Sequence, residues 1–99
     1  MATYILLTKL SPEATTSPSR LKELEQNVKE KISKHCPSVK WISNYAILGP
    51  YDYLDIFEAP DDTVATKAVT IIRSFGHAVT ETWTGIPWQR FKDMVSDIK

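Results

Sequence analysis

Two histidines and one cysteine are the side chains in this sequence best suited to bind a metal ion or to act as nucleophiles. His35 and Cys36 are adjacent, and His77 is the only other histidine, so a zinc site, which needs about four ligands, is poorly supported. Neighbours in sequence seldom point at each other, which makes a Cys–His nucleophile pair a weak alternative. Cys36 is expected to be a partly buried, inert thiol, and His35 to interact with the end of its helix. The sequence therefore predicts neither a metal site nor a cofactor.

A second candidate is the stretch Gly49-Pro50-Tyr51-Asp52. It is not a phosphate-binding loop, because it has a single glycine, no lysine and no helix directly after it. Glycine and proline favour a turn, and the side chain of Asp52 can bond to nearby amides. We therefore interpret the stretch as the tip of a hairpin, where Tyr51 and Asp52 can also line the mouth of a pocket.

Polar residues on the expected strands form a third candidate; they are Ser43, Tyr45, Asp55, His77 and Glu81. If the sides of the strands that carry them coincide, titratable groups meet on a mainly apolar surface, where burial shifts pKa values. The alternative is a polar network within a dimer interface, or solvated residues at a sheet edge. Structural networks of this kind also perturb pKa values, and we favour this second interpretation.

The hydrophobic pattern predicts the elements that must position these residues. Four segments are rich in strand-forming residues: 4–10, 39–48, 53–59 and 77–84. Apolar residues recur at helical spacing after Pro18, after Asp61 and from Trp88 onward, with Ser17 as the expected N-cap of the first helix. Residues 11–17 are expected to form a loop. The order is βαββαβ followed by a C-terminal helix.

This order is that of a ferredoxin-like α+β fold, with one antiparallel sheet and both long helices on one face. The apolar stripes of the two helices are expected to be fully committed to the core; they are Leu21, Leu24, Val28 and Ile71, Ile72, Phe75. Aromatic residues are expected on the other face: Trp41, Tyr45, Phe57 and Trp83. Because large exposed apolar patches mark interfaces, we expect a homodimer, sheet against sheet, that buries upwards of ~1,200 Å² in total.

Composition narrows the class of protein. The chain has 99 residues, which suits one domain over residues 1–99. Lys+Arg and Asp+Glu balance at 12 each, so the chain has no net charge that would attract it to nucleic acid or to an anionic membrane. The third expected strand reads Tyr-Leu-Asp-Ile-Phe-Glu and is acidic, which also argues against nucleic-acid binding. No apolar run can span a bilayer, the N-terminus lacks the features of a signal peptide, and the lone cysteine cannot form an internal disulfide. We therefore expect a cytoplasmic protein.

Three segments carry a resemblance to a known family: ATYILLTKLSPE, NYAILGPYDYLDIFEAPDD and TETWTGIP. They resemble the GYD domain family, named for the Gly, Tyr and Asp that stand here as Gly49, Tyr51 and Asp52. The similarity covers nearly the whole chain. The family is similar to dimeric α+β barrel proteins, in which two ferredoxin-like sheets pack face to face. The resemblance implies this fold and dimerisation, and it leaves the activity open.

Two functions follow as hypotheses. The first is a non-catalytic binding or interaction module for a small, mostly apolar metabolite. The alternative is a cofactor-independent enzyme, a monooxygenase or isomerase acting on an aromatic or polyketide-like substrate, as some dimeric α+β barrel proteins are. A closed apolar cavity that holds His77 or Tyr45 favours the enzyme, and a filled core favours the interaction protein.

A ligand site is expected only at an end of the layer between helices and sheet, near the loop over residues 11–17 or beside the C-terminal helix, since the helix stripes are assigned to the core. We predict at most a small pocket there, with apolar walls and a few convergent polar groups. Tyr51, Trp88 and Phe91 form its walls, and Asp52 or His77 supplies the polar contact.

Overall fold

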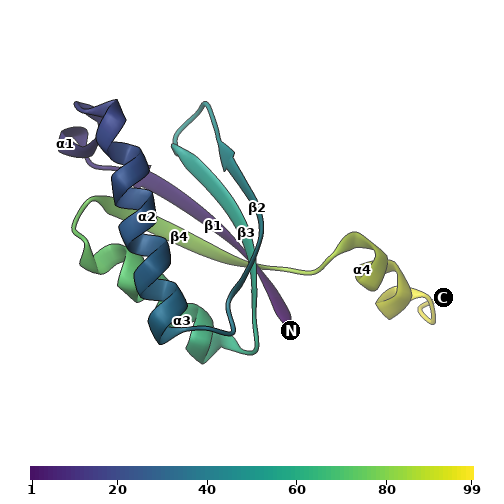
Figure 1. Cartoon of the computed structure of the whole chain (residues 1–99). Helices are drawn as coiled ribbons and strands as arrows, with labels where there is room; N and C mark the ends of the chain where they lie inside the picture. The colour runs from purple at the N-terminus through teal and green to yellow at the C-terminus, as the bar shows by residue number, and fades with distance from the viewer.

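Four strands pair into one antiparallel sheet in the order β2-β3-β1-β4, and two long helices cross one of its faces (Figure 1). The computed structural model describes residues 1–99. Its elements are β1 (Ala2–Leu10), α1 (Pro12–Thr15), α2 (Pro18–His35), β2 (Lys40–Ala46), β3 (Tyr53–Ala59), α3 (Asp62–Ser74), β4 (Ala78–Gly85) and α4 (Trp88–Val95). This is the ferredoxin-like arrangement that the sequence predicts, so the predicted fold class is confirmed.

Local chemistry sets most of the helix ends. The Asp61 side chain accepts a hydrogen bond from the backbone N–H of Val64 at 3.0 Å and so caps α3. Gly76, with φ of 74°, follows the end of the same helix, where positive φ favours glycine. Ser17 lies at the N-cap position of α2, but its side chain makes no capping bond. Rigid φ at Pro18 therefore does more than Ser17 to start this helix.

The expected loop over residues 11–17 contains the short helix α1, so that part of the prediction is wrong. Ser11 caps α1 by accepting a hydrogen bond from the N–H of Ala14 at 3.4 Å, and Pro12 occupies its first turn. Serine followed by proline is a helix-start signal as well as a loop signal, and a helix of four residues is too short to show an apolar period.

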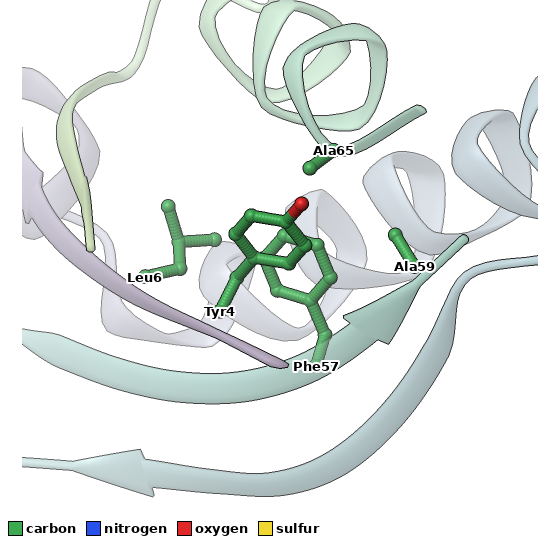
Figure 2. Close-up of a cluster of buried hydrophobic side chains, with 5 residues drawn as sticks. All are labelled: Tyr4, Leu6, Phe57, Ala59 and Ala65. Carbon is green, nitrogen blue, oxygen red and sulfur yellow. The ribbon is translucent and has the colours of Figure 1, made fainter. Parts of the chain in front are cut away.

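The main core lies between the sheet and α3. Tyr4, Leu6, Phe57 and Ala59 rise from the strands toward Ala65 of α3, and the rings of Tyr4 and Phe57 lie against each other (Figure 2). Their centroids are 5.3 Å apart in a stacked arrangement. A second cluster joins α2 to α3 through Ile32, Cys36, Ala68 and Ile71. Because Ile32 is the one buried residue of α2, the C-terminal half of this helix is packed more tightly than its N-terminal half.

A β-bulge in β2 overturns part of the predicted side-chain pattern. Trp41 pairs with Phe57 and Ser43 pairs with Ile56, so the register shifts by one residue between them. Strict alternation would place Trp41 and Tyr45 on the same side, but the extra residue turns Tyr45 to the opposite face. Trp41 and Phe57 therefore lie on the helix side, 5.5 Å apart between ring centroids, and not on the other face as expected.

The uncovered face of the sheet is the one that neither α2 nor α3 crosses. Its pairing pattern brings together Ile5, Leu7, Tyr45, Leu54, Ile56, Val79, Glu81 and Trp83. Tyr45 and Trp83 lie here as the sequence predicts. Val79 is 68% exposed and Trp83 49% exposed, so this face presents apolar side chains to its surroundings.

The last helix, α4, projects away from the rest of the chain (Figure 1). Ile86 and Pro87 are its only link to β4. The rings of Trp88 and Phe91 stack on each other with centroids 5.2 Å apart, and Trp88 remains 70% exposed. The expected apolar stripe of this helix is therefore present, but it packs against no other element. None of the helices has the length and apolarity needed to cross a bilayer.

Candidate functional site

A cavity of about 320 Å³ lies between the N-terminal half of α2 and the sheet. Its walls are mainly apolar: 12 of its 18 lining residues are hydrophobic. Leu21, Leu24 and Val28 of α2 face into it, so they are half-buried and not fully committed to the core as expected. The cavity reaches Leu10 and His77 at the end of this layer beside residues 11–17, where a pocket was expected, but Tyr51, Trp88 and Phe91 do not line it.

The floor of the cavity explains why it stays open. Beneath Leu24 and Val28 the strands present short or polar side chains, namely Thr8, Asn44, Ala46 and Asp55. Such side chains do not reach the helix, whereas the larger Phe57 fills the space further along β3. Short and polar side chains on the floor therefore contribute to the open space under α2.

Asp55 is the one carboxylate on this floor. It lies in the middle of β3, paired with Leu6 on one side and Asn44 on the other. Burial raises the pKa of Asp55 from its usual 3.8 to about 6, Lys29 opposes this rise and Glu25 adds to it. A carboxyl group of this kind is partly protonated near neutral pH and can accept or donate a proton there.

The rim of the cavity carries the remaining charged and titratable groups. On α2 the ammonium of Lys29 is bonded to the carboxylate of Glu25 at 3.0 Å. His77 and Tyr45 also line the cavity, and both are exposed. Burial is the main cause that raises the pKa of Tyr53, with the charge of Asp52 adding to it. The cavity is thus apolar inside, with polar groups at its opening and Asp55 at its base.

The stretch from Gly49 to Asp52 forms the turn that the sequence predicts. Gly49 has φ of 138°, a value that L residues rarely adopt. The Asp52 carboxylate accepts a hydrogen bond from the N–H of Leu10 at 2.7 Å, and the N–H of Asp52 donates to the carbonyl of Thr8 at 2.8 Å. These bonds tie the β2–β3 turn to the end of β1, which is a structural role for Asp52.

Tyr51 reaches from the same turn toward the uncovered face. Its hydroxyl donates to Glu81, whose other carboxylate oxygen accepts from the indole N–H of Trp83 at 2.8 Å. The bond to Glu81 raises the pKa of Tyr51, and the same bond is the main cause that lowers the pKa of Glu81. The three side chains form a polar cluster beside the exposed apolar residues of this face.

The polar residues singled out from the sequence do not meet on one surface. Asp55 faces α2, while Ser43, Tyr45 and Glu81 belong to the uncovered face. His77 precedes β4 and lines the cavity from its rim. The strand sides therefore do not coincide, because Asp55 and Glu81 pair with successive residues of β1, whose side chains point in opposite directions.

The five predicted ligand-binding residues occupy separate places. His77 lines the cavity, Asp52 holds the turn, Tyr51 belongs to the uncovered face, and Trp88 and Phe91 lie on α4. Their part in ligand binding remains a prediction. Sequence reasoning did not place Asp55 in a cavity, although one signal was present: an aspartate between Leu54 and Ile56 in the middle of β3.

A second, more polar groove of about 350 Å³ lies between α3 and β4. Threonines and Arg73 dominate its lining, and the guanidinium of Arg73 donates to the carbonyl of Thr80 at 3.3 Å. The hydroxyl of Thr80 is buried without a hydrogen-bond partner. No group of three or more His, Cys, Asp or Glu side chains is arranged to hold a metal ion.

Comparison with known proteins places this fold and turn in a family. The GYD domain matches residues 4–95, a range that includes the four strands, both long helices and α4. This chain belongs to the GYD domain family. It is also 29% identical, over 100% of both chains, to the glutamine synthetase and cystathionine beta-lyase binding protein of Thermus thermophilus. The family resemblance seen in the sequence is thus confirmed, and it covers the turn with Gly49, Tyr51 and Asp52.

Proposed function

We propose that this GYD domain protein is a single-domain binding module that takes up a small, mostly apolar molecule in the cavity under α2. The cavity is the observation that carries the proposal. It has apolar walls, one carboxylate at its base and a volume of about 320 Å³, within the range of small-molecule sites. A cytoplasmic location is part of the proposal and is compatible with the free, buried thiol of Cys36.

The experiment fills the cavity with a larger side chain on α2. Leu24→Trp adds bulk where Leu24 faces the cavity, and Glu23→Trp adds the same bulk on the exposed side of α2. A library of aromatic fragments is screened by NMR against the wild type and both variants. We expect fragments to shift the methyl signals of Leu21 and Val28 in the wild type and in Glu23→Trp, but not in Leu24→Trp.

Two results of the screen would contradict the proposal. Because the cavity is empty space next to Leu24, the larger side chain can enter it at little cost in stability. If fragments bind Leu24→Trp as well as they bind the wild type, the cavity is not the binding site. If no fragment shifts the signals of residues that line the cavity, the proposal fails.

Self-association is part of the proposed function. Val79, Trp83 and Tyr45 are exposed on the uncovered face, and two copies packed sheet against sheet would cover them both. Such a dimer leaves α2 and its cavity on the outside of each subunit. Ligand uptake and dimerisation therefore use opposite faces of the sheet, except at the edge strand β2, where Tyr45 lies on the uncovered face and also lines the cavity.

Catalysis is the alternative function for the same cavity. Asp55, with a pKa of about 6, can exchange protons with an aromatic or polyketide-like substrate near neutral pH. We favour binding because the other candidate groups, His77 and Tyr45, are exposed at the rim and not gathered around Asp55. Mass spectrometry of the fragment mixtures separates the two: a new product that forms with wild type and not with Asp55→Asn supports the enzyme.

Binding to another protein is a second candidate, favoured by α4. Trp88, Met94 and Ile98 are 70%, 55% and 72% exposed at the C-terminal end, an apolar surface without a partner in the chain. The name of the Thermus relative states that it binds two enzymes, glutamine synthetase and cystathionine beta-lyase. We propose that α4 is the part of this chain that contacts such a protein.

A further inference from the structure

We propose that the cavity under α2 selects molecules with an apolar body and a positively charged amino group, and that the amino group pairs with Asp55. This inference rests on the proposed function, because it names the chemical class of ligand for the same cavity. It draws on the position of Asp55, on the charges around it and on the size of the space.

The position of Asp55 favours an ion pair with a ligand cation. Asp55 rises from the middle of the floor, with Leu6 and Asn44 beside it in the sheet and Leu24 and Val28 above it in the cavity wall. An ionised carboxylate in such surroundings has lost part of its hydration. A ligand cation that enters the cavity replaces that hydration and gains a charge-assisted hydrogen bond.

The surrounding charges favour a cation over an anion. Around the cavity α2 supplies Glu25 and Lys29, β3 supplies Asp55 and Tyr53, β2 supplies Tyr45, and His77 lies before β4. Lys29, the single ammonium of the set, forms its ion pair with Glu25 at 3.0 Å, and its charge also acts on Asp55, whose pKa it lowers. The set holds two carboxylates, Glu25 and Asp55, and one ammonium, so one carboxylate is left in excess for a ligand cation.

Size limits the apolar body. A volume of about 320 Å³ lies near the lower end of the range for small-molecule sites, roughly 300–1,000 Å³. One aromatic ring with a short chain suits such a space. We therefore expect arylalkylamines to be better ligands than long-chain amines or multi-ring cations.

The test uses three probes that share a phenyl ring and a short chain and differ in charge. Phenethylamine is a cation, 2-phenylethanol is neutral and phenylacetate is an anion. Each is titrated at pH 7.5 and its affinity is measured from the methyl signals of Leu21, Leu24 and Val28. The full chain is used as wild type, Asp55→Asn, His77→Gln and Glu58→Gln, the last of which removes a carboxylate of β3 that lies outside the cavity.

We expect phenethylamine to bind at least about tenfold more tightly than 2-phenylethanol, and phenylacetate to bind most weakly. Asp55→Asn should abolish the preference for the amine while it still binds the alcohol, which also shows that the variant is folded. Glu58→Gln should keep the preference. Burial raises the pKa of Asp55 to about 6, so lowering the pH from 7.5 to 5 should weaken amine binding about tenfold and leave alcohol binding unchanged.

His77 is the other cavity group whose charge can change on acidification, and a protonated His77 would also repel a cation. If Asp55 is responsible, His77→Gln keeps the tenfold loss of amine binding at pH 5. If His77→Gln removes the pH dependence, or if Asp55→Asn binds the amine as tightly as wild type does, the inference is wrong.

The probes also separate this inference from the proposed function. If the alcohol or phenylacetate shifts the cavity methyl signals and the amine does not, the cavity binds ligands but does not select cations, so only the inference fails. If none of the three probes shifts these signals, both the inference and the proposed function are contradicted.

Discussion

Asp55 occupies a position where an apolar side chain would pack better. Its neighbours along β3 are Leu54 and Ile56, and the one ammonium at the cavity, Lys29, forms its ion pair with Glu25 and only partly offsets the burial of Asp55. Burying a carboxylate in this way costs folding free energy. Residues that reduce stability are most often kept at sites of function, which is why Asp55 and not the conspicuous turn carries our proposals.

We predict that Asp55→Asn stabilises the protein at pH 7.5 and not at pH 4. The folded-state pKa, about 6, is above the usual 3.8, so the folded state binds this proton more tightly than the unfolded state does. The penalty is therefore fully present above pH 6 and disappears as the pH falls through 6 toward 4. The difference in pKa corresponds to about 3 kcal/mol, which solvent at the cavity mouth reduces to about 1–2 kcal/mol.

Urea unfolding of wild type and variant at the two pH values measures this gain. Glu58→Gln is the control, since it removes a carboxylate from the same strand but outside the cavity. A gain of equal size at pH 4 and pH 7.5 would show that the Asp55 charge is not its cause.

At the scale of elements, the sequence predicts some boundaries closely and others not at all. Strand β3 has the predicted bounds because Asp52 before it and Pro60 after it interrupt the apolar pattern. Helix α2 begins at Pro18 as predicted and ends just before Pro37. Proline and turn residues leave a signal in the sequence because their own backbone chemistry ends an element.

The bulge in β2 leaves no such signal. Ile42, the residue between the two shifted pairs, looks like any strand residue, so strict alternation carries through it and places Trp41 on the wrong face. The cavity was unpredictable for a related reason. Leu21, Leu24 and Val28 form the same helical stripe whether the space below is full or empty, and the difference lies in side chains on other strands.

We predict that substitutions on the apolar surface of α4 keep the fold and weaken binding to a protein partner. The double variant Trp88→Ser/Phe91→Ser should keep the wild-type circular dichroism spectrum, because α4 has no extensive contact with any other element. If α4 is the docking element proposed above, its affinity for glutamine synthetase, one of the enzymes in the name of the Thermus relative, should fall at least about 30-fold by biolayer interferometry, as for the loss of an interface hot spot. Gln89→Ser/Lys92→Ser is the control on the same helix and should bind as wild type does. Equal binding by both double variants would exclude α4 as the docking element.

At the scale of the whole molecule, the uncovered face predicts a dimer. Sedimentation at micromolar concentration should give about 22.4 kDa, twice the chain mass of 11.2 kDa. Val79→Lys places a charge among the exposed apolar residues of this face and should shift the protein to the monomer. Thr82→Lys, on the other side of the same strand, should leave it dimeric. A wild-type protein that sediments as a monomer would contradict the sheet-to-sheet arrangement.

Strand β4 also separates the two candidate binding regions in space. Ala78, its first residue, lines the cavity, and Gly85, its last, leads through two residues into α4. Seven residue steps at about 3.3 Å set these ends about 23 Å apart. A small molecule in the cavity therefore leaves α4 free to contact a protein. If both proposals hold, one chain can bind a small molecule in the cavity and a protein at α4 at the same time.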